Sequence, residues 1–137
     1  SAVEENGNNG EENKVIEETR KIFGRDDLPM SVTCVRVPVL RAHTEVVRVT
    51  FTSPVTPDDA RRALEAAEGV QVMDDPAANR FPMPVEATGV DDVLVGRVRQ
   101  DPSEPRALDL MICGDQLLKG AALNAVQVAE RLTQRTN

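Results

Sequence analysis

Residues 93–113 decide the fold class: VLVGRVRQ at 93–100, the polar connection DPSEPR at 101–106, and ALDLMIC at 107–113. Both outer segments are rich in aliphatic residues, and the connection carries two prolines. This pattern predicts two strands that form an antiparallel pair. The alternating VQV at 70–72 predicts a short third strand. These segments place a β-sheet in the second half of the chain.

Two further segments are rich in β-branched residues, SVTCVRVPVL at 31–40 and EVVRVTF at 45–51. Such residues favour extended backbone, so both segments are predicted to be extended. Pro38 cannot donate to a sheet ladder, so we expect an edge or a bulge at that position.

Helix signals lie between the predicted strands. Asn9 and Glu12 have capping-box spacing before a periodic apolar pattern that ends at Gly24. Thr56-Pro57 followed by two aspartates predicts a second helix over 57–68, and a stripe of Leu and Ala predicts a final helix over 117–134. Residues 74–92 have the composition of a loop. The predicted fold is therefore α+β, with a mixed, largely antiparallel sheet and helices packed on it.

Composition limits the possible functions. The chain has 137 residues and a net charge of −7, with 2% aromatic residues. That size predicts one domain. Acidic charge and few aromatic residues argue against nucleic acid and anionic membranes as partners. One histidine and two distant cysteines make a metal site improbable. We expect a disordered acidic segment over 1–9, a folded domain over 10–137, and a reducing compartment.

His43 is the only histidine, and imidazole is the side chain best suited to proton transfer near neutral pH. A single histidine at the end of a strand is more often a surface or hydrogen-bonded core residue. Arg36 lies in an apolar segment, where a guanidinium needs a carboxylate from the protein or from a ligand. A straight strand would separate Arg36 from His43 by about 23 Å, so a shared ligand requires a bend near Pro38.

Two more segments carry candidate residues. Glu11 and Lys14 lie one turn apart on the first helix, a spacing that also fits an ordinary solvated ion pair. The segment 113–125 passes from a strand through Gly114 into a helix. The first-turn amides of that helix could bind an anion or an amide-bearing cofactor, and its small residues could equally serve tight packing.

Five blocks of the sequence, in order, resemble the C-terminal part of aspartate-semialdehyde dehydrogenase: EENKVIEETRKI (11–22), CVRVPVLRAH (34–43), DDPAANRFPMP (74–84), DDVLVGRVRQD (91–101) and CGDQLLKGAALNAVQVAE (113–130). The resemblance covers Glu11 to Leu132. It implies the dimerisation domain of an oxidoreductase that uses NADP. The reaction converts aspartyl phosphate to aspartate semialdehyde, for lysine, threonine and methionine biosynthesis.

The resemblance also implies roles for individual residues. His43 matches the acid/base histidine, and Arg36 matches the arginine that binds the substrate carboxylate. Glu11 matches the glutamate that faces the substrate amino group, and Lys14 matches the phosphate-binding lysine. Gln116 matches the amide residue on the nicotinamide side of the cofactor.

This sequence departs from the family pattern in one respect. The family's thioester-forming cysteine lies in an Asn-Cys-Ser/Thr segment, and neither Cys34 nor Cys113 has that setting. Residues 1–137 also lack a glycine-rich dinucleotide motif, so we expect no Rossmann domain within them. We therefore expect the chain to be inactive alone, to bind no cofactor stably, and to form a homodimer in the bacterial cytoplasm or the plastid stroma. The alternative is a stand-alone, non-catalytic dimerisation or regulatory module of the same fold.

Overall fold

A computed structural model describes residues 2–134. The chain forms two compact units, Ser1–Pro38 and Val39–Asn137. No helix within residues 2–134 has both the length and the hydropathy needed to cross a membrane. In the same residues, no three His, Cys, Asp or Glu side chains are grouped as metal ligands.

The first unit is built on helix α1, Gly10–Phe23. The predicted capping box is confirmed: the Asn9 side chain accepts from the Glu11 and Glu12 N–H groups, and Glu12 Oε2 accepts from the Asn9 N–H at 2.8 Å. Gly24 ends the helix with a φ of 61°, a left-handed conformation that favours glycine. Upstream, Val3 and Asn9 form an isolated bridge. The domain division at residue 9 stays a prediction.

Residues 31–40 form no strand in this structure. The backbone bends at Pro38, where the sequence indicated an edge or a bulge. β-Branched residues favour extended backbone, but a strand also requires a neighbour that supplies ladder hydrogen bonds. Within residues 2–134 this segment has no such neighbour.

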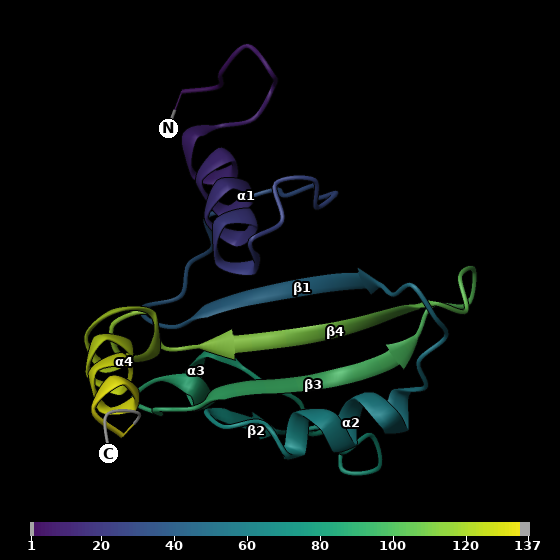
Figure 1. Cartoon of the computed structure of the whole chain (residues 1–137). Coiled ribbons are helices and arrows are strands. Elements are labelled where there is room, and N and C mark those ends of the chain that lie inside the picture. The colour runs from purple at the N-terminus through teal and green to yellow at the C-terminus, as the bar shows by residue number, and fades with distance from the viewer. Residues whose placement is uncertain (1, 135–137) are drawn as a thin grey trace. The chain divides into compact units, whose positions relative to one another are not determined.

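The second unit contains a four-stranded mixed sheet, shown in Figure 1. Its strands are β1 (His43–Thr50), β2 (Val70–Val72), β3 (Val93–Gln100) and β4 (Ala107–Gly114), in the order β1-β4-β3-β2. The predicted antiparallel pairing of 93–100 with 107–113 is confirmed. β1 is also antiparallel to β4, whereas β2 is parallel to β3. The predicted α+β fold with a mixed, largely antiparallel sheet is therefore correct.

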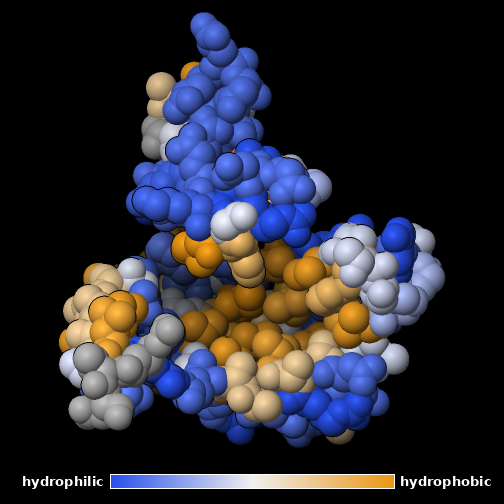
Figure 2. Space-filling view, viewed as in Figure 1, coloured by the Kyte–Doolittle hydropathy of each residue, from blue (hydrophilic) through white to orange (hydrophobic). Residues whose placement is uncertain are grey.

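The helices of the second unit cover different parts of this sheet. Helix α2 (Pro57–Glu65) packs Ala60 and Leu64 against the face that carries Val95 and Leu108. The four-residue helix α3 (Pro84–Ala87) packs Ala87 against Leu94 on the opposite face. After β4, a π-helical turn, η1 (Leu118–Ala122), continues into α4 (Leu123–Gln134). The face covered by α2 retains apolar surface between α2 and α4 (Figure 2).

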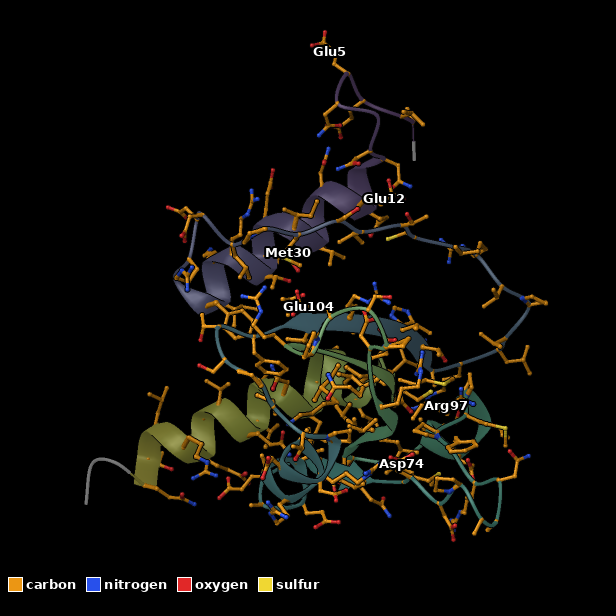
Figure 3. All side chains as sticks on the ribbon, turned by 90° about the vertical axis from the view of Figure 1, so that its right-hand side faces the viewer. Glu5, Glu12, Met30, Asp74, Arg97 and Glu104 are labelled. Atoms are coloured by element: carbon orange, nitrogen blue, oxygen red, sulfur yellow. The ribbon has the colours of Figure 1, made fainter. Side chains whose placement is uncertain are left out.

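A β-bulge interrupts the pairing of β3 with β4 between Gly96 and Arg99. Arg97 within the bulge has a φ of 54°. Asp74 stabilises this backbone by accepting from the Arg97 N–H at 2.8 Å and the Val98 N–H at 3.2 Å, and from Arg61 Nε at 2.8 Å. Asp74 and Arg97 lie close together in Figure 3.

Candidate functional site

His43 and Gln116 line the same hollow in the second unit. His43 is the first residue of β1, and its side chain is exposed. It pairs with Gly114, the last residue of β4, so Gln116 follows just beyond the neighbouring strand end. The sheet register therefore brings together two candidate residues that are far apart in the sequence.

The hollow has a volume of about 200 Å³. Glu45 and Ile112 are directly paired across β1 and β4, as are His43 and Gly114, so both pairs face the same side of the sheet. Lys119 of η1 completes the polar lining, and its Nζ donates to Gln127 Oε1 at 2.6 Å. A complete small-ligand pocket typically has about 300–1,000 Å³. A hollow of this size accommodates only part of such a ligand.

The Gln116 side chain is oriented by the backbone of the segment before β1. Its Oε1 accepts from the Ala42 N–H at 2.9 Å. This bond fixes which end of the amide is the acceptor and leaves the NH₂ group free to donate. Such a donor matches the carbonyl oxygen of a carboxamide, the group that a nicotinamide ring carries.

Asp115 is the buried charge beside this site. Its side chain has 0% exposure and pairs with Arg41 Nη2 at 2.7 Å. Burial by itself raises the pKa of Asp115, but hydrogen bonds from the Gly89 N–H, Arg41 and the Leu117 N–H outweigh it and lower the pKa to about 2. Asp115 is therefore an anion near neutral pH.

The other three candidates lie in the first unit. Glu11 and Lys14 are both exposed on α1, and no ion pair joins them among the contacts of residues 2–134. Arg36 is exposed and likewise has no ion pair there, so it is not the buried structural cation that its apolar neighbours suggested. Its convergence with His43 stays a prediction.

Glu12 links the two segments that carry these candidates. Its Oε2 accepts from the Asn9 N–H and its Oε1 accepts from the Cys34 N–H at 2.9 Å, and the two bonds lower the pKa of Glu12 in that order of importance. Figure 3 shows Glu12 near the beginning of α1. The residue two positions before Arg36 is thus held against the first turn of α1, which carries Glu11.

The two cysteines have different environments. Cys113 is fully buried, and burial raises the pKa of its thiol despite a contact of 3.3 Å with Thr44 Oγ1. A buried thiol with a raised pKa is a poor nucleophile. Cys34 is exposed, and no disulfide joins the two.

Sequence reasoning missed Arg41, Asp115, Glu45 and Lys119. One signal was available for Asp115: a carboxylate directly after an apolar strand, between Gly114 and a residue already assigned to the cofactor. Arg41 gave no such signal, because its partner lies far along the chain.

This chain is similar to known semialdehyde dehydrogenases. Residues 1–119 match the family described as semialdehyde dehydrogenase, dimerisation domain. Curated relatives named aspartate-semialdehyde dehydrogenase come from Synechocystis, 57% identical over 91% of this chain and 37% of the relative, and from Prochlorococcus marinus, 51% identical over 99% and 40%.

Solved structures agree with the sequence relatives. A crystal structure titled aspartate semialdehyde dehydrogenase II complexed with ASA, from Vibrio cholerae, superposes with a TM-score of 0.91 at 39% identity. It is matched over 98% of this chain and 39% of its own. The chain spans about two fifths of the length of the curated relatives it matches. The chain therefore belongs to the semialdehyde dehydrogenase family, within its dimerisation domain.

Proposed function

We propose that this chain is the substrate-binding and dimerisation segment of an NADP-dependent aspartate-semialdehyde dehydrogenase. The observation that carries the proposal is the shared hollow of His43 and Gln116, in a chain whose relatives bear that name. In the proposed reaction, aspartyl phosphate is reduced to aspartate semialdehyde with release of phosphate, within lysine, threonine and methionine biosynthesis.

His43 is the proposed acid/base residue. Its exposed imidazole at the start of β1 is accessible to a ligand in the hollow. Imidazole can accept and return a proton near neutral pH without a large change in its environment. His43 would therefore transfer a proton to or from the oxygen on the reacting carbon, or remove the proton from the attacking thiol.

Gln116 is the proposed cofactor contact. Its NH₂ group, which has no acceptor among residues 2–134, fits the carboxamide of a nicotinamide ring, and NADPH would supply the hydride when bound. We place no other part of the cofactor on this chain, which has no glycine-rich phosphate loop. The chain alone is accordingly proposed to bind NADP weakly or not at all.

The first unit is proposed to bind the substrate. Arg36 offers a planar guanidinium that can hold a carboxylate by two bonds, and Lys14 offers an ammonium for phosphate. Glu11 offers a carboxylate for the substrate ammonium group. All three side chains are exposed, and Glu12 holds the two segments that carry them together.

The nucleophile is proposed to lie outside this chain. Cys113 is unsuited because it is buried, and Cys34 lacks the Asn-Cys-Ser/Thr setting of the family. Covalent acyl transfer needs an accessible thiolate, so catalysis would require the rest of the enzyme. We further propose a homodimer formed through this domain, located in a bacterial cytoplasm or a plastid stroma.

Steady-state kinetics of the complete protein test this proposal. His43→Asn should lower kcat by about 10² to 10⁴ with a smaller change in KM, because it removes proton transfer. Arg36→Lys should raise KM and lower kcat, because an ammonium cannot make the two-point contact. Arg25→Lys is the matched control, since Arg25 is exposed in the same unit and its ion pair among residues 2–134 is with Asp27. Full kcat in His43→Asn would refute the assignment.

A further inference from the structure

Three separate segments meet at the carboxylate of Asp115. Its Oδ1 accepts from the Leu117 N–H at 2.9 Å, and its Oδ2 accepts from the Gly89 N–H at 2.7 Å. The same Oδ2 pairs with Arg41 Nη2 at 2.7 Å. One buried anion thus joins the segment after β4, the loop after α3 and the segment before β1.

The segments before β1 and after β4 are joined at three successive points. Arg41 pairs with Asp115, the Ala42 N–H donates to Gln116, and His43 pairs with Gly114 in the sheet. Gln116 directly follows Asp115, and His43 lies two positions after Arg41, with Ala42 between them. A displacement of either segment would change the separation of the His43 ring from the Gln116 amide.

The backbone at Ala42 is strained, and the surrounding residues hold it in that conformation. Ala42 has a φ of 75°, a left-handed conformation that costs energy for a residue with a Cβ. Ala42 is also buried, at 2% exposure, in the cluster formed with Leu94 and Cys113. Arg41 Nε is buried and has no hydrogen-bond partner among the described residues. The position of the guanidinium therefore leaves one of its own donors unused. Strained backbone of this kind concentrates at functional sites.

We propose that Arg41 and Asp115 are a positioning pair that fixes the separation of His43 and Gln116. Asp115 borders the hollow, but its side chain has 0% exposure, so the pair acts through these two neighbours. This inference rests on the proposed function of His43 and Gln116. The Arg41 side chain is 35% exposed, but that of Asp115 is fully buried, so removing Arg41 leaves a buried charge without its counter-ion. A misplacement of about 1 Å at reacting groups can reduce a rate by about 10²-fold.

Asp74 provides a matched control. Its side chain is nearly as buried as that of Asp115, at 2% exposure, and likewise accepts from two backbone N–H groups and pairs with one arginine, Arg61 at 2.8 Å. It stabilises the β3 bulge and α2, and it does not line the hollow that contains His43. Asp74→Asn and Asp115→Asn thus remove equivalent bonds at two places, only one of them beside the site.

Kinetics of the complete enzyme should separate the two variants. Asp115→Asn and Arg41→Met should lower kcat by about 10-fold to 10²-fold and change KM by less than about threefold. Both substitutions alter the separation of His43 and Gln116 and leave the proposed substrate-binding residues in place. Arg41→Lys, which keeps the charge, should recover part of the loss. Asp74→Asn should lower thermal stability but leave kcat within about twofold. Equal kcat values for Asp115→Asn and Asp74→Asn would overturn the proposal.

A readout independent of activity uses this chain itself. His43 is its only histidine, so its ring C–H proton signals can be recognised without assignment. Arg41→Met and Asp115→Asn should shift or broaden these signals, whereas Asp74→Asn should leave them unchanged. Unchanged signals in both site variants would overturn the positioning role even if the enzyme is active. Shifted signals combined with full activity of His43→Asn would support the pair and refute the proposed function instead.

Discussion

Substitution of Gly96 by alanine gives the most direct test of the packing of β2 against β3. A Cβ added at Gly96 would lie 2.0 Å from the Met73 carbonyl oxygen and 2.6 Å from Pro82 Cδ. The closest comfortable carbon–oxygen contact is about 3.3 Å, so the Met73 carbonyl would have to move by about 1.3 Å. The obstacle is backbone, which cannot rotate away as a flexible side chain can.

This displacement also breaks a hydrogen bond. The Met73 N–H donates to the Val95 carbonyl at 2.8 Å and thereby continues the β2–β3 pairing. A shift of more than 1 Å takes this bond beyond hydrogen-bonding range. Overpacking costs about 1–3 kcal/mol. The lost bond adds about 0.5–1.5 kcal/mol, so the expected loss in free energy of unfolding is about 1.5–4.5 kcal/mol.

Urea unfolding followed by far-UV circular dichroism measures this loss, because the chain has no Trp or Tyr for fluorescence. With a slope near 2 kcal/mol per molar urea, the midpoint should fall by about 1–2 M. Gly114→Ala is the control, since its added Cβ would lie 3.7 Å from Val93 Cγ2, an ordinary contact. Equal midpoints for the two variants would refute the steric reasoning.

Three further outcomes are expected. The thermal midpoint should fall as pH decreases from about 4 to about 2, because the pKa of Asp115 is lowered to about 2 from an ordinary 3.8 and its contribution is lost only on protonation; calorimetry of Asp115→Asn should show a smaller fall, and an equal fall would contradict this. The isolated chain should form no NADPH from aspartate semialdehyde and phosphate, and activity that survives Cys34→Ser and Cys113→Ser would contradict the missing nucleophile. Sedimentation should detect self-association at micromolar concentration, whereas a strictly monomeric chain would argue against the proposed homodimer.

Local signals explain which parts of the fold the sequence could predict. Asn9 with Glu12, and Thr56 with Pro57, carry their capping information within four residues, and both helices begin where predicted. The second helix ends at Glu65, before the predicted residue 68, because capping at its C-terminus has no comparable signal. The short α3 was missed, since four residues within a Pro-rich and Asp-rich segment have too little periodicity to recognise.

The candidate site was predictable only in part. His43 and Gln116 were singled out by chemistry and by family resemblance, and their proximity follows from the β1–β4 register. The pairing of Arg41 with Asp115 could not be inferred, because it depends on a long-range alignment of two strands. Residues 31–40 show the converse limitation, since strong β-propensity there did not lead to a strand.

The order of strands in the sheet has a consequence for folding kinetics. β3 and β4 are joined by residues 101–106 and can pair after a short loop closure, whereas Thr44 and Cys113, which pair β1 with β4, are 69 positions apart. Closing the longer loop costs more chain entropy, so we expect β1 to dock late, on a preformed hairpin. Pulse-labelled hydrogen exchange should then protect β3 amides before β1 amides. His43 is the first residue of β1, so the hollow that it shares with Gln116 would be completed only in the final steps of folding.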